Sequence, residues 1–146
     1  MIIVADTSAL LAAFSPAESD HHDCLAYLNA HGQFVYSPMV LTEFDHLVRA
    51  RSGRFDTALD AHRQLLARVE AGSDLIADIE MADHLAAAGL REKHRDMELD
   101  LADALGVVLA RKYSTDLIFT LDEGDFRRLR PLDDFTHFRI MPKDVV

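Results

Sequence analysis

Four acidic side chains stand at positions from which they could act together on a metal ion. Asp6 and Asp122 each follow a short apolar stretch, in "IIVADTSAL" and "LIFTLDEGDF". Asp103 is the one charged residue of "LADALGVVLA", and Glu43 lies among apolar residues in "PMVLTEFDHLV". Carboxylates that converge without a cation repel one another, by about 4 kcal/mol for a pair ~4 Å apart at an effective dielectric near 20. If the fold brings these acids together, they therefore predict a cation site.

The residue types indicate which cation and which chemistry. The chain has a single cysteine, Cys24, which excludes a zinc site built from several cysteines. Carboxylate oxygens and water are the ligands of hard ions, so Mg²⁺ is expected, with Mn²⁺ as a possible substitute. Such ions activate water and stabilise a leaving oxygen in phosphoryl transfer and phosphodiester hydrolysis. The acids therefore predict one of these two reactions.

Each acid also has a simpler structural explanation. Asp6 and Asp122 could cap the helices that follow them, and Asp125 could cap the short segment "FRRL". Asp100 as N-cap with Asp103 at the third helical position would form a variant of the capping box. Capping does not explain why the helix around Asp103 is apolar on nearly all sides, so we expect Asp103 to be buried, and therefore paired, protonated or bound to a metal.

Glu43 lies on or beside the apolar stripe of its predicted helix. Its neighbours four residues away are Met39 and Leu47, and residues at this spacing share a helix face. The glutamate could lie at the edge of the stripe, could pair with an arginine, or could belong to the acidic site. The sequence leaves these three interpretations open.

Short apolar segments that alternate with amphipathic ones predict an α/β fold with a short parallel sheet of about four to five strands, flanked by helices. We expect strands at 2–5, 34–37, 74–79, 117–121 and 138–140, and helices at 7–14, 17–31, 38–52, 55–69, 80–94 and 101–113. No repeat or linker divides the chain, so residues 1–146 are expected to form a single domain. Ligands of such sheets bind beyond the carboxyl ends of the strands, where Asp6 and Asp122 are predicted to lie.

Composition limits the function further. The formal charge of −10, from 25 acids and 15 bases, argues against a surface that coats nucleic acid, although not against nucleic acid at one site. The apolar N-terminus lacks the basic start of a signal peptide. No apolar run approaches the ~20 residues of a membrane span. We therefore expect a cytoplasmic protein with no membrane partner.

The same segments resemble the PIN-domain ribonucleases and, among them, the VapC-type toxins of type II toxin–antitoxin systems. "VADTSALLAAF" is similar to the family's opening strand with its first acid, and "SPMVLTEFDHLV" to its P-x-V-x-x-E helix with the second. "LADALGVVLARKY" is similar to the D-A helix with the third acid, and "IFTLDEGDF" to the closing T-x-D-x-x-x-F segment with the fourth. The resemblance covers essentially the whole chain and implies a three-layer PIN-like fold.

The resemblance also implies an activity and its residues. The catalytic acids that hold one or two Mg²⁺ ions would be Asp6, Glu43, Asp103 and Asp122, supported by Ser8 and Thr120, with the roles of Asp100 and Asp125 open. The implied reaction is endonucleolytic cleavage of RNA, in tRNA or rRNA loops or in mRNA, which leaves a 5′-phosphate and a 3′-hydroxyl and inhibits translation. The implied partners are a cognate antitoxin and a second copy of the chain, as a homodimer.

Basic residues that could hold RNA phosphates flank the predicted acidic site. They are Arg49, Arg51 and Arg54 after the Glu43 segment, and Arg127 and Arg128 after Asp122. Charge on solvated helix ends explains each group equally well.

Two other functions remain as alternatives to a ribonuclease. One is a catalytically inactive PIN-like binding module. The other is a receiver-type signalling domain, which would need adjacent acids after the first strand, whereas Asp6 has no acidic neighbour.

Overall fold

The computed structural model describes residues 1–145. Its strands are β1 (Ile2–Ala5), β2 (Gln33–Tyr36), β3 (Leu75–Ile76), β4 (Leu117–Phe119) and β5 (Arg139–Met141). Its helices are α1 (Thr7–Phe14), α2 (His21–Ala30), α3 (Pro38–Ser52), α4 (Phe55–Glu70), α5 (Met81–Lys93), α6 (Leu101–Lys112) and α7 (Glu123–Arg128), with a 3₁₀ turn at Arg95–Met97. The predicted alternation of short strands and helices is confirmed.

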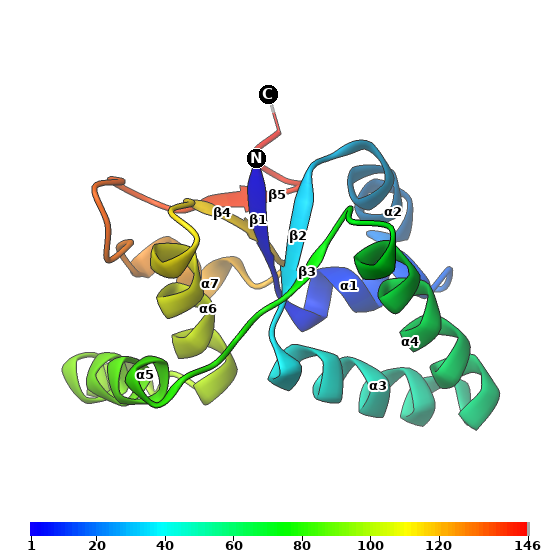
Figure 1. Ribbon diagram of the computed structural model, residues 1–146, viewed down its shortest axis with the longest axis horizontal. Helices are drawn as coiled ribbons and strands as arrows, with labels where there is room; N and C mark the ends of the chain where they lie inside the picture. Colours follow the sequence, from blue (N-terminus) through cyan, green and yellow to red (C-terminus); the bar gives the residue numbers. More distant parts are fainter. Residues whose placement is uncertain (146) are drawn as a thin grey trace.

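The five strands form one parallel sheet in the order β3-β2-β1-β4-β5. β1 lies at the centre, with Val4 opposite both Val35 of β2 and Ile118 of β4. Helices α1–α4 lie on one side of the sheet and α5–α7 on the other (Figure 1). The expected three-layer α/β architecture is therefore present, and it places the ends of β1 and β4 side by side.

Alternate residues of each strand pack into different cores. Ile3, Phe34 and Phe119 point into the core shared with α1–α4. Val4, Val35 and Ile118 point into the core shared with α5–α7. Because both faces are covered, the strands are apolar throughout rather than alternating with polar residues, which is why they read as uniformly apolar in the sequence.

Local signals set the bounds of α3, the helix that carries Glu43. The Ser37 side chain accepts hydrogen bonds from the backbone N–H groups of Met39 and Val40, both at 3.1 Å. Pro38 occupies the first helical position, where a proline suits the helix. Gly53 ends the helix with φ = 68°, a left-handed conformation that glycine adopts at low cost. The predicted range 38–52 is confirmed.

Several predicted elements differ from the structure in their bounds. Helix α2 begins only at His21 because residues 17–20 form turns, and β3 is two residues long rather than six. Residues 123–128 form helix α7, whereas no helix range was expected there and only the segment "FRRL" after Asp125 was assigned to a short turn. The "EGDFRR" segment has only one buried apolar side chain, Phe126, so it carries almost no apolar periodicity that could have revealed a helix.

A buried polar network joins the outer part of the sheet to the helices on one face. Asp74, 1% exposed, accepts hydrogen bonds from Phe34 N at 3.0 Å, from Arg68 Nε at 2.5 Å and from the Tyr36 hydroxyl. Arg68 Nη2 also donates to the carbonyl of Leu28 at 3.0 Å. One carboxylate therefore links β2, α4 and, through Arg68, α2.

Among the helices of residues 1–145, none is both long enough and apolar enough to cross a bilayer.

Candidate active site

Asp6 follows β1 and precedes α1, but its side chain does not cap that helix. Its Oδ2 instead accepts a hydrogen bond from Thr120 Oγ1 at 2.7 Å and a longer one from Ser8 Oγ at 3.4 Å. The capping interpretation of the Asp6 side chain is therefore wrong. The carboxylate is turned toward the end of β4, where the segment with Asp122 begins.

The two hydroxyl groups form a small network that joins β1 to the chain after β4. Ser8 Oγ and Thr120 Oγ1 lie 3.1 Å apart. Ser8 Oγ accepts from Leu121 N at 2.9 Å, and Thr120 Oγ1 accepts from Asp122 N at 3.0 Å. These contacts fix the orientation of Asp6 relative to Asp122, and the supporting role of Ser8 and Thr120 stays a prediction.

Asp103 is buried in the first turn of α6, 7% exposed. Its backbone N–H donates to Asp100 Oδ1 at 2.9 Å, so Asp100 is the N-cap, as the capping pattern predicts. One carboxylate oxygen each of Asp103, Asp122 and Asp125 lie within 4.8 Å of one another. Asp125 thus belongs to the acidic site, whereas Asp100 caps α6.

Mutual repulsion and burial change the acidity of the site. The pKa of Asp103 rises to about 8, first because burial disfavours its charge and then because Asp6, Asp100, Asp122 and Asp125 are negatively charged. The pKa of Asp6 is raised chiefly by burial, against hydrogen bonds from Thr120 and Thr7 that lower it. Without a metal ion, the charged forms of Asp6 and Asp103 are therefore disfavoured.

None of the four predicted acids, nor Asp125, forms an ion pair with a basic side chain of residues 1–145. A group of carboxylates that is close together, partly buried and unbalanced by the chain's own cations fits a hard divalent cation. The donor set contains oxygen atoms only, which agrees with the ion expected from the residue types.

Glu43 lies near Asp6 but not on the buried stripe of α3. The buried face of that helix is formed by Val40, Phe44 and Val48, whereas Glu43 is exposed. Glu43 therefore lies beside the apolar stripe rather than on it, which agrees with the interpretation that places it at the stripe's edge. Its charge still raises the pKa of Asp6, which places Glu43 at the open edge of the acidic site.

The predicted phosphate-binding arginines are spread over two regions. Arg51 pairs with Glu18, and the guanidinium of Arg49 lies over the ring of Phe55, 5.5 Å from its centre. Arg49 follows Glu43 by six residues, or ~9 Å along the helix axis, and Arg54 lies beyond the helix end. Arg128 lies 3.8 Å from Asp96. RNA binding by these residues stays a prediction.

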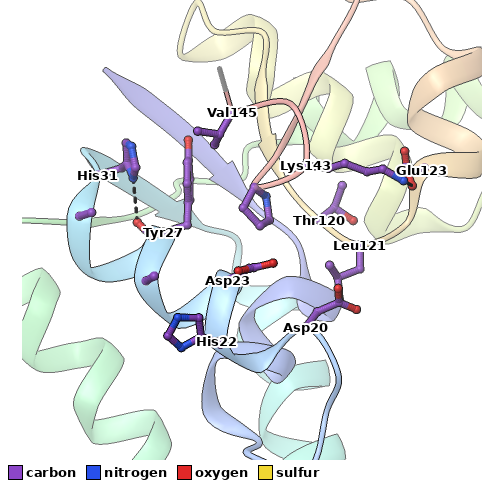
Figure 2. Close-up of a pocket in the computed structure, with 13 residues that line it drawn as sticks. Asp20, His22, Asp23, Tyr27, His31, Thr120, Leu121, Glu123, Lys143 and Val145 are labelled. Carbon is purple, nitrogen blue, oxygen red and sulfur yellow. Dashed lines mark hydrogen bonds and ion pairs between the residues drawn. The ribbon is translucent and has the colours of Figure 1, made fainter.

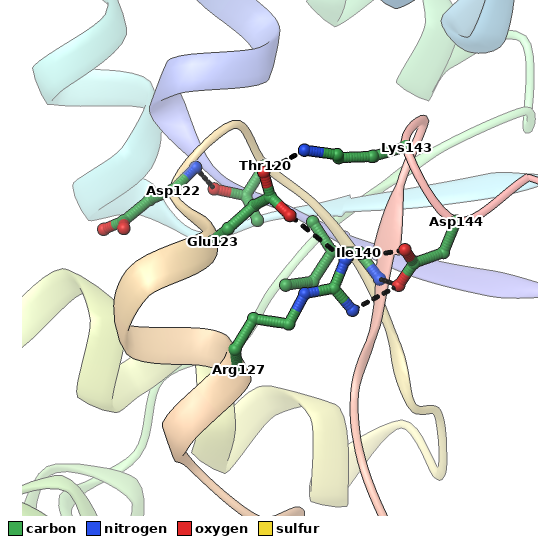
Figure 3. Close-up of polar contacts among 7 residues, drawn as sticks. All are labelled: Thr120, Asp122, Glu123, Arg127, Ile140, Lys143 and Asp144. Atoms are coloured by element: carbon green, nitrogen blue, oxygen red, sulfur yellow. Dashed lines mark hydrogen bonds and ion pairs between the residues drawn. The ribbon is translucent and has the colours of Figure 1, made fainter.

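Arg127 makes its contacts with other parts of the chain. Its guanidinium donates to both oxygens of Asp144, at 2.7 and 2.6 Å, and to Glu123 at 3.2 Å. Asp144 also accepts from Ile140 N at 2.8 Å, and Lys143 Nζ donates to Glu123 at 2.6 Å. Figure 3 shows this network on one side of α7, with the Asp122 carboxylate pointing away from it. The network fastens α7 to the segment after β5.

Sequence reasoning missed this network, because its contacts between α7 and the segment after β5 join residues 17 to 20 apart and no range was predicted for α7. Arg127 was expected to bind RNA, but its donors are used within the chain. Through these contacts Arg127 holds α7, the helix that carries Asp125 and begins directly after Asp122, against the segment after β5.

Replacing Arg127 by methionine is expected to weaken divalent-metal binding by up to about tenfold, because α7 would then move relative to α6. The protein should remain folded, since the ion pair is partly exposed. Calorimetric titration with Mn²⁺ measures the change. Arg130→Met, which removes an exposed arginine just after α7, is the matched control; equal losses from both would contradict a specific role.

The whole chain was compared with known proteins. Residues 3–131 match the model of the PIN domain family. The chain belongs to the PIN-domain family. It is 37% identical over 131 residues to Ribonuclease VapC26 of Mycobacterium tuberculosis, covering 89% of this chain and 93% of that protein. Within the family, this places the chain among the VapC-type ribonucleases, as the four sequence segments suggested.

Two solved structures share the PIN fold. The crystal structure of Mycobacterium tuberculosis VapC20, a sarcin–ricin loop cleaving toxin, has a TM-score of 0.72 at 19% identity and covers 84% of this chain and 91% of its own. VapBC2 from Rickettsia felis, bound to a DNA fragment from its promoter, has a TM-score of 0.69 at 16% identity, with 96% and 98% covered.

Proposed function

We propose that this PIN-domain protein is a Mg²⁺-dependent endoribonuclease toxin that cleaves loops of tRNA or rRNA, or mRNA, and so inhibits translation. The observation that carries the proposal is the convergence of acids: Asp103, Asp122 and Asp125 within 4.8 Å, beside Asp6 at the end of the neighbouring strand. The names of its relatives, a ribonuclease and an RNA-loop cleaving toxin, support RNA as the substrate.

The metal would be held by Asp6, Asp103 and Asp122, with Glu43 at the exposed edge and Asp125 beside them. Bound Mg²⁺, or Mn²⁺ in its place, supplies activation of water and stabilisation of the leaving oxygen. Asp103 is anchored because most of α6 is buried, and Thr120 and Ser8 orient the Asp6 carboxylate. Breaking the bond between phosphorus and the 3′-oxygen would leave a 5′-phosphate and a 3′-hydroxyl.

We further propose a cognate antitoxin, a homodimer and a cytoplasmic location. The VapBC2 assembly supports an antitoxin partner for VapC-type proteins. Ile76 in the edge strand β3 and Met81 and Leu85 in α5 have exposed apolar side chains, which a second copy of the chain could cover. Light scattering of the full chain, alone and after co-expression with a candidate antitoxin, tests both partners.

Cleavage of defined RNA loops tests the proposed activity. The full chain should cut them with Mg²⁺ or Mn²⁺, lose this activity in excess chelator and regain it when Mg²⁺ is restored. Mapping of 5′-phosphate ends identifies the cut. Asp6→Asn should abolish cleavage, and Asp56→Asn, which changes an exposed acid on α4, should not. A folded wild-type protein that binds its partner but cuts no RNA with either ion would instead be an inactive binding module.

A further inference from the structure

Phe55 is an aromatic side chain that the fold leaves on the surface. It is 59% exposed, more than any other phenylalanine or tyrosine of residues 1–145, and it belongs to neither core. The guanidinium of Arg49 lies over its ring, 5.5 Å from the ring centre. Arg49 lies near the end of α3, and Phe55 begins α4 directly after Arg54 (Figure 1). These three residues form what we call the α3–α4 corner.

The start of α4 does not suit a purely structural role. Arg54 occupies the N-cap of this helix, but its side chain makes no capping hydrogen bond, unlike Ser37 at the start of α3. A positive charge is also unfavourable at this end of the helix dipole. Phe55 gains little from burial at the first helical position. Residues that go against local preferences without a structural gain are expected at functional sites.

The α3–α4 corner combines cations with an aromatic ring. Arg49 and Arg54 are exposed and form no ion pair in the part of the chain that the structure describes, whereas Arg51 pairs with Glu18. Proteins bind single-stranded nucleic acid with this combination, because cations attract the phosphates and an aromatic ring stacks on a base. The planar guanidinium of arginine stacks on bases as well. The corner therefore has the chemistry of a site for single-stranded RNA.

The α3–α4 corner is close enough to the acidic site for one RNA strand to reach both. Glu43, at the open edge of that site, precedes Arg49 by six residues, or ~9 Å along the helix axis. Glu43, His46 and Arg49 are all exposed, and residues at this spacing are neighbours on a helix surface. Nucleotides of a stacked strand are ~3.4 Å apart along its axis, so about three of them span the distance.

The other side of the acidic site disfavours phosphate. An open pocket of about 860 Å³ lies there, between α2 and the chain that follows β4 and β5 (Figure 2). Lys143 of this pocket is paired with Glu123. Asp20 and Asp23, which also line it, have no ion pair among residues 1–145. Since β4 and β5 lie on one side of β1, and β2, which leads into α3, lies on the other, these charges direct a bound strand toward α3.

We infer that Phe55 stacks on an unpaired base of the RNA, about three nucleotides from the cleaved phosphodiester, while Arg49 and Arg54 hold the neighbouring phosphates. The inference rests on the proposed ribonuclease function and names single-stranded RNA as the form that is bound. Every base has a face that can stack, so this contact would not select a sequence. A protein partner could also cover an exposed ring, but the unpaired arginines and the exposed residues that lead to Glu43 favour RNA.

The first experiment measures RNA binding without cleavage. Fluorescence anisotropy gives the affinity of the full chain for a short, labelled, single-stranded RNA at low salt in chelator. Phe55→Ala should weaken binding about tenfold, within the range for loss of one base stacked on an aromatic ring, and Phe55→Tyr should retain it. Phe135→Ala is the matched control, because Phe135 is also exposed but lies beside Met1 and Leu117, at the amino ends of β1 and β4. No binding by wild type, or equal affinities of wild type and Phe55→Ala, overturns the inference.

The second experiment locates the stacked base. RNA substrates that each lack one base, at successive positions from the cut, are cleaved with Mg²⁺ by wild type and by Phe55→Ala. For wild type, KM should rise about tenfold, with kcat unchanged, when the missing base is the one that stacks. The same substrate should not raise the KM of Phe55→Ala further, because the ring and the base act as a pair. If no position behaves in this way, the inference is overturned.

The two experiments also separate this inference from the proposed function. If Phe55→Ala weakens RNA binding and no RNA is cleaved, the ribonuclease proposal fails and the base-stacking role stands. If RNA is cleaved and Phe55→Ala changes neither affinity nor KM, the base-stacking role fails alone. If Phe55→Ala weakens binding of an antitoxin and leaves RNA binding unchanged, the α3–α4 corner belongs to a protein partner and the inference is overturned.

Discussion

Asp103→Asn is expected to reduce RNA cleavage at least about a hundredfold while the protein stays folded. The substitution removes a buried carboxylate from the group that would hold the metal, and a loss of several kcal/mol of charge stabilisation corresponds to this factor. The volume of the side chain is kept, so the packing of α6 should not change. Initial rates of cleavage at saturating Mg²⁺ provide the measurement.

Asp100→Asn is the matched control. Asp100 lies in the same short segment, but it is exposed and accepts a hydrogen bond from Asp103 N, which an asparagine can also accept. Activity should therefore stay within a few-fold of wild type. Equal losses from the two variants would mean that the cap and the metal ligand have been assigned to the wrong residues.

Asp103→Asn should also change how stability depends on pH. Below pH ~4 the carboxyl group is protonated in both the folded and the unfolded chain. Because its pKa is about 8 in the folded chain against an ordinary 3.8, the folded state retains a proton that the unfolded state loses. The free energy of unfolding of metal-free wild type should therefore fall between pH 4 and pH 8.

The asparagine of the variant does not titrate, so its free energy of unfolding should not fall in this way. At pH 8 the metal-free variant should therefore be more stable than metal-free wild type by a few kcal/mol. Urea unfolding at pH 5 and pH 8 in chelator measures the difference. Excess Mg²⁺ at pH 8 should raise the free energy of unfolding of wild type by about 2.7 kcal/mol at a hundredfold excess over Kd. The same addition should raise that of the variant by less. A difference that is the same at both pH values would contradict the raised pKa.

Asp74→Ala is expected to destabilise the fold by about 3 kcal/mol or more. The substitution removes the shared acceptor of Phe34 N, Tyr36 and Arg68 and leaves the Arg68 charge without its partner. Breaking a buried pair costs about 3–5 kcal/mol. Urea unfolding monitored by circular dichroism measures the change.

Asp60→Ala, which removes an exposed acid of α4, is the control and should change the free energy of unfolding by less than about 0.5 kcal/mol. If Asp74→Ala proved equally mild, the buried network would not be what holds the outer strands to α4 and α2.

The sequence alone determined most of the elements, and it singled out the acids that the fold brings together. Strands covered on both faces must be apolar throughout, and Ser37, Pro38 and Gly53 specify the ends of α3 by their own chemistry. The position of Asp103 in an apolar helix predicted a buried acid. Asp100 already caps that helix, so capping does not explain a second carboxylate at Asp103. These are local properties, readable without tertiary structure.

Only the tertiary structure decided how those residues are combined. It turned the Asp6 side chain from a helix cap to Thr120, placed Glu43 on the exposed side of α3, and brought Asp125 to Asp103 and Asp122. It also engaged Arg127 with Asp144 and opened the pocket beside Thr120. Each of these depends on segments far apart in the chain, and the spacing of residues along one segment specifies its own faces but not what lies opposite them.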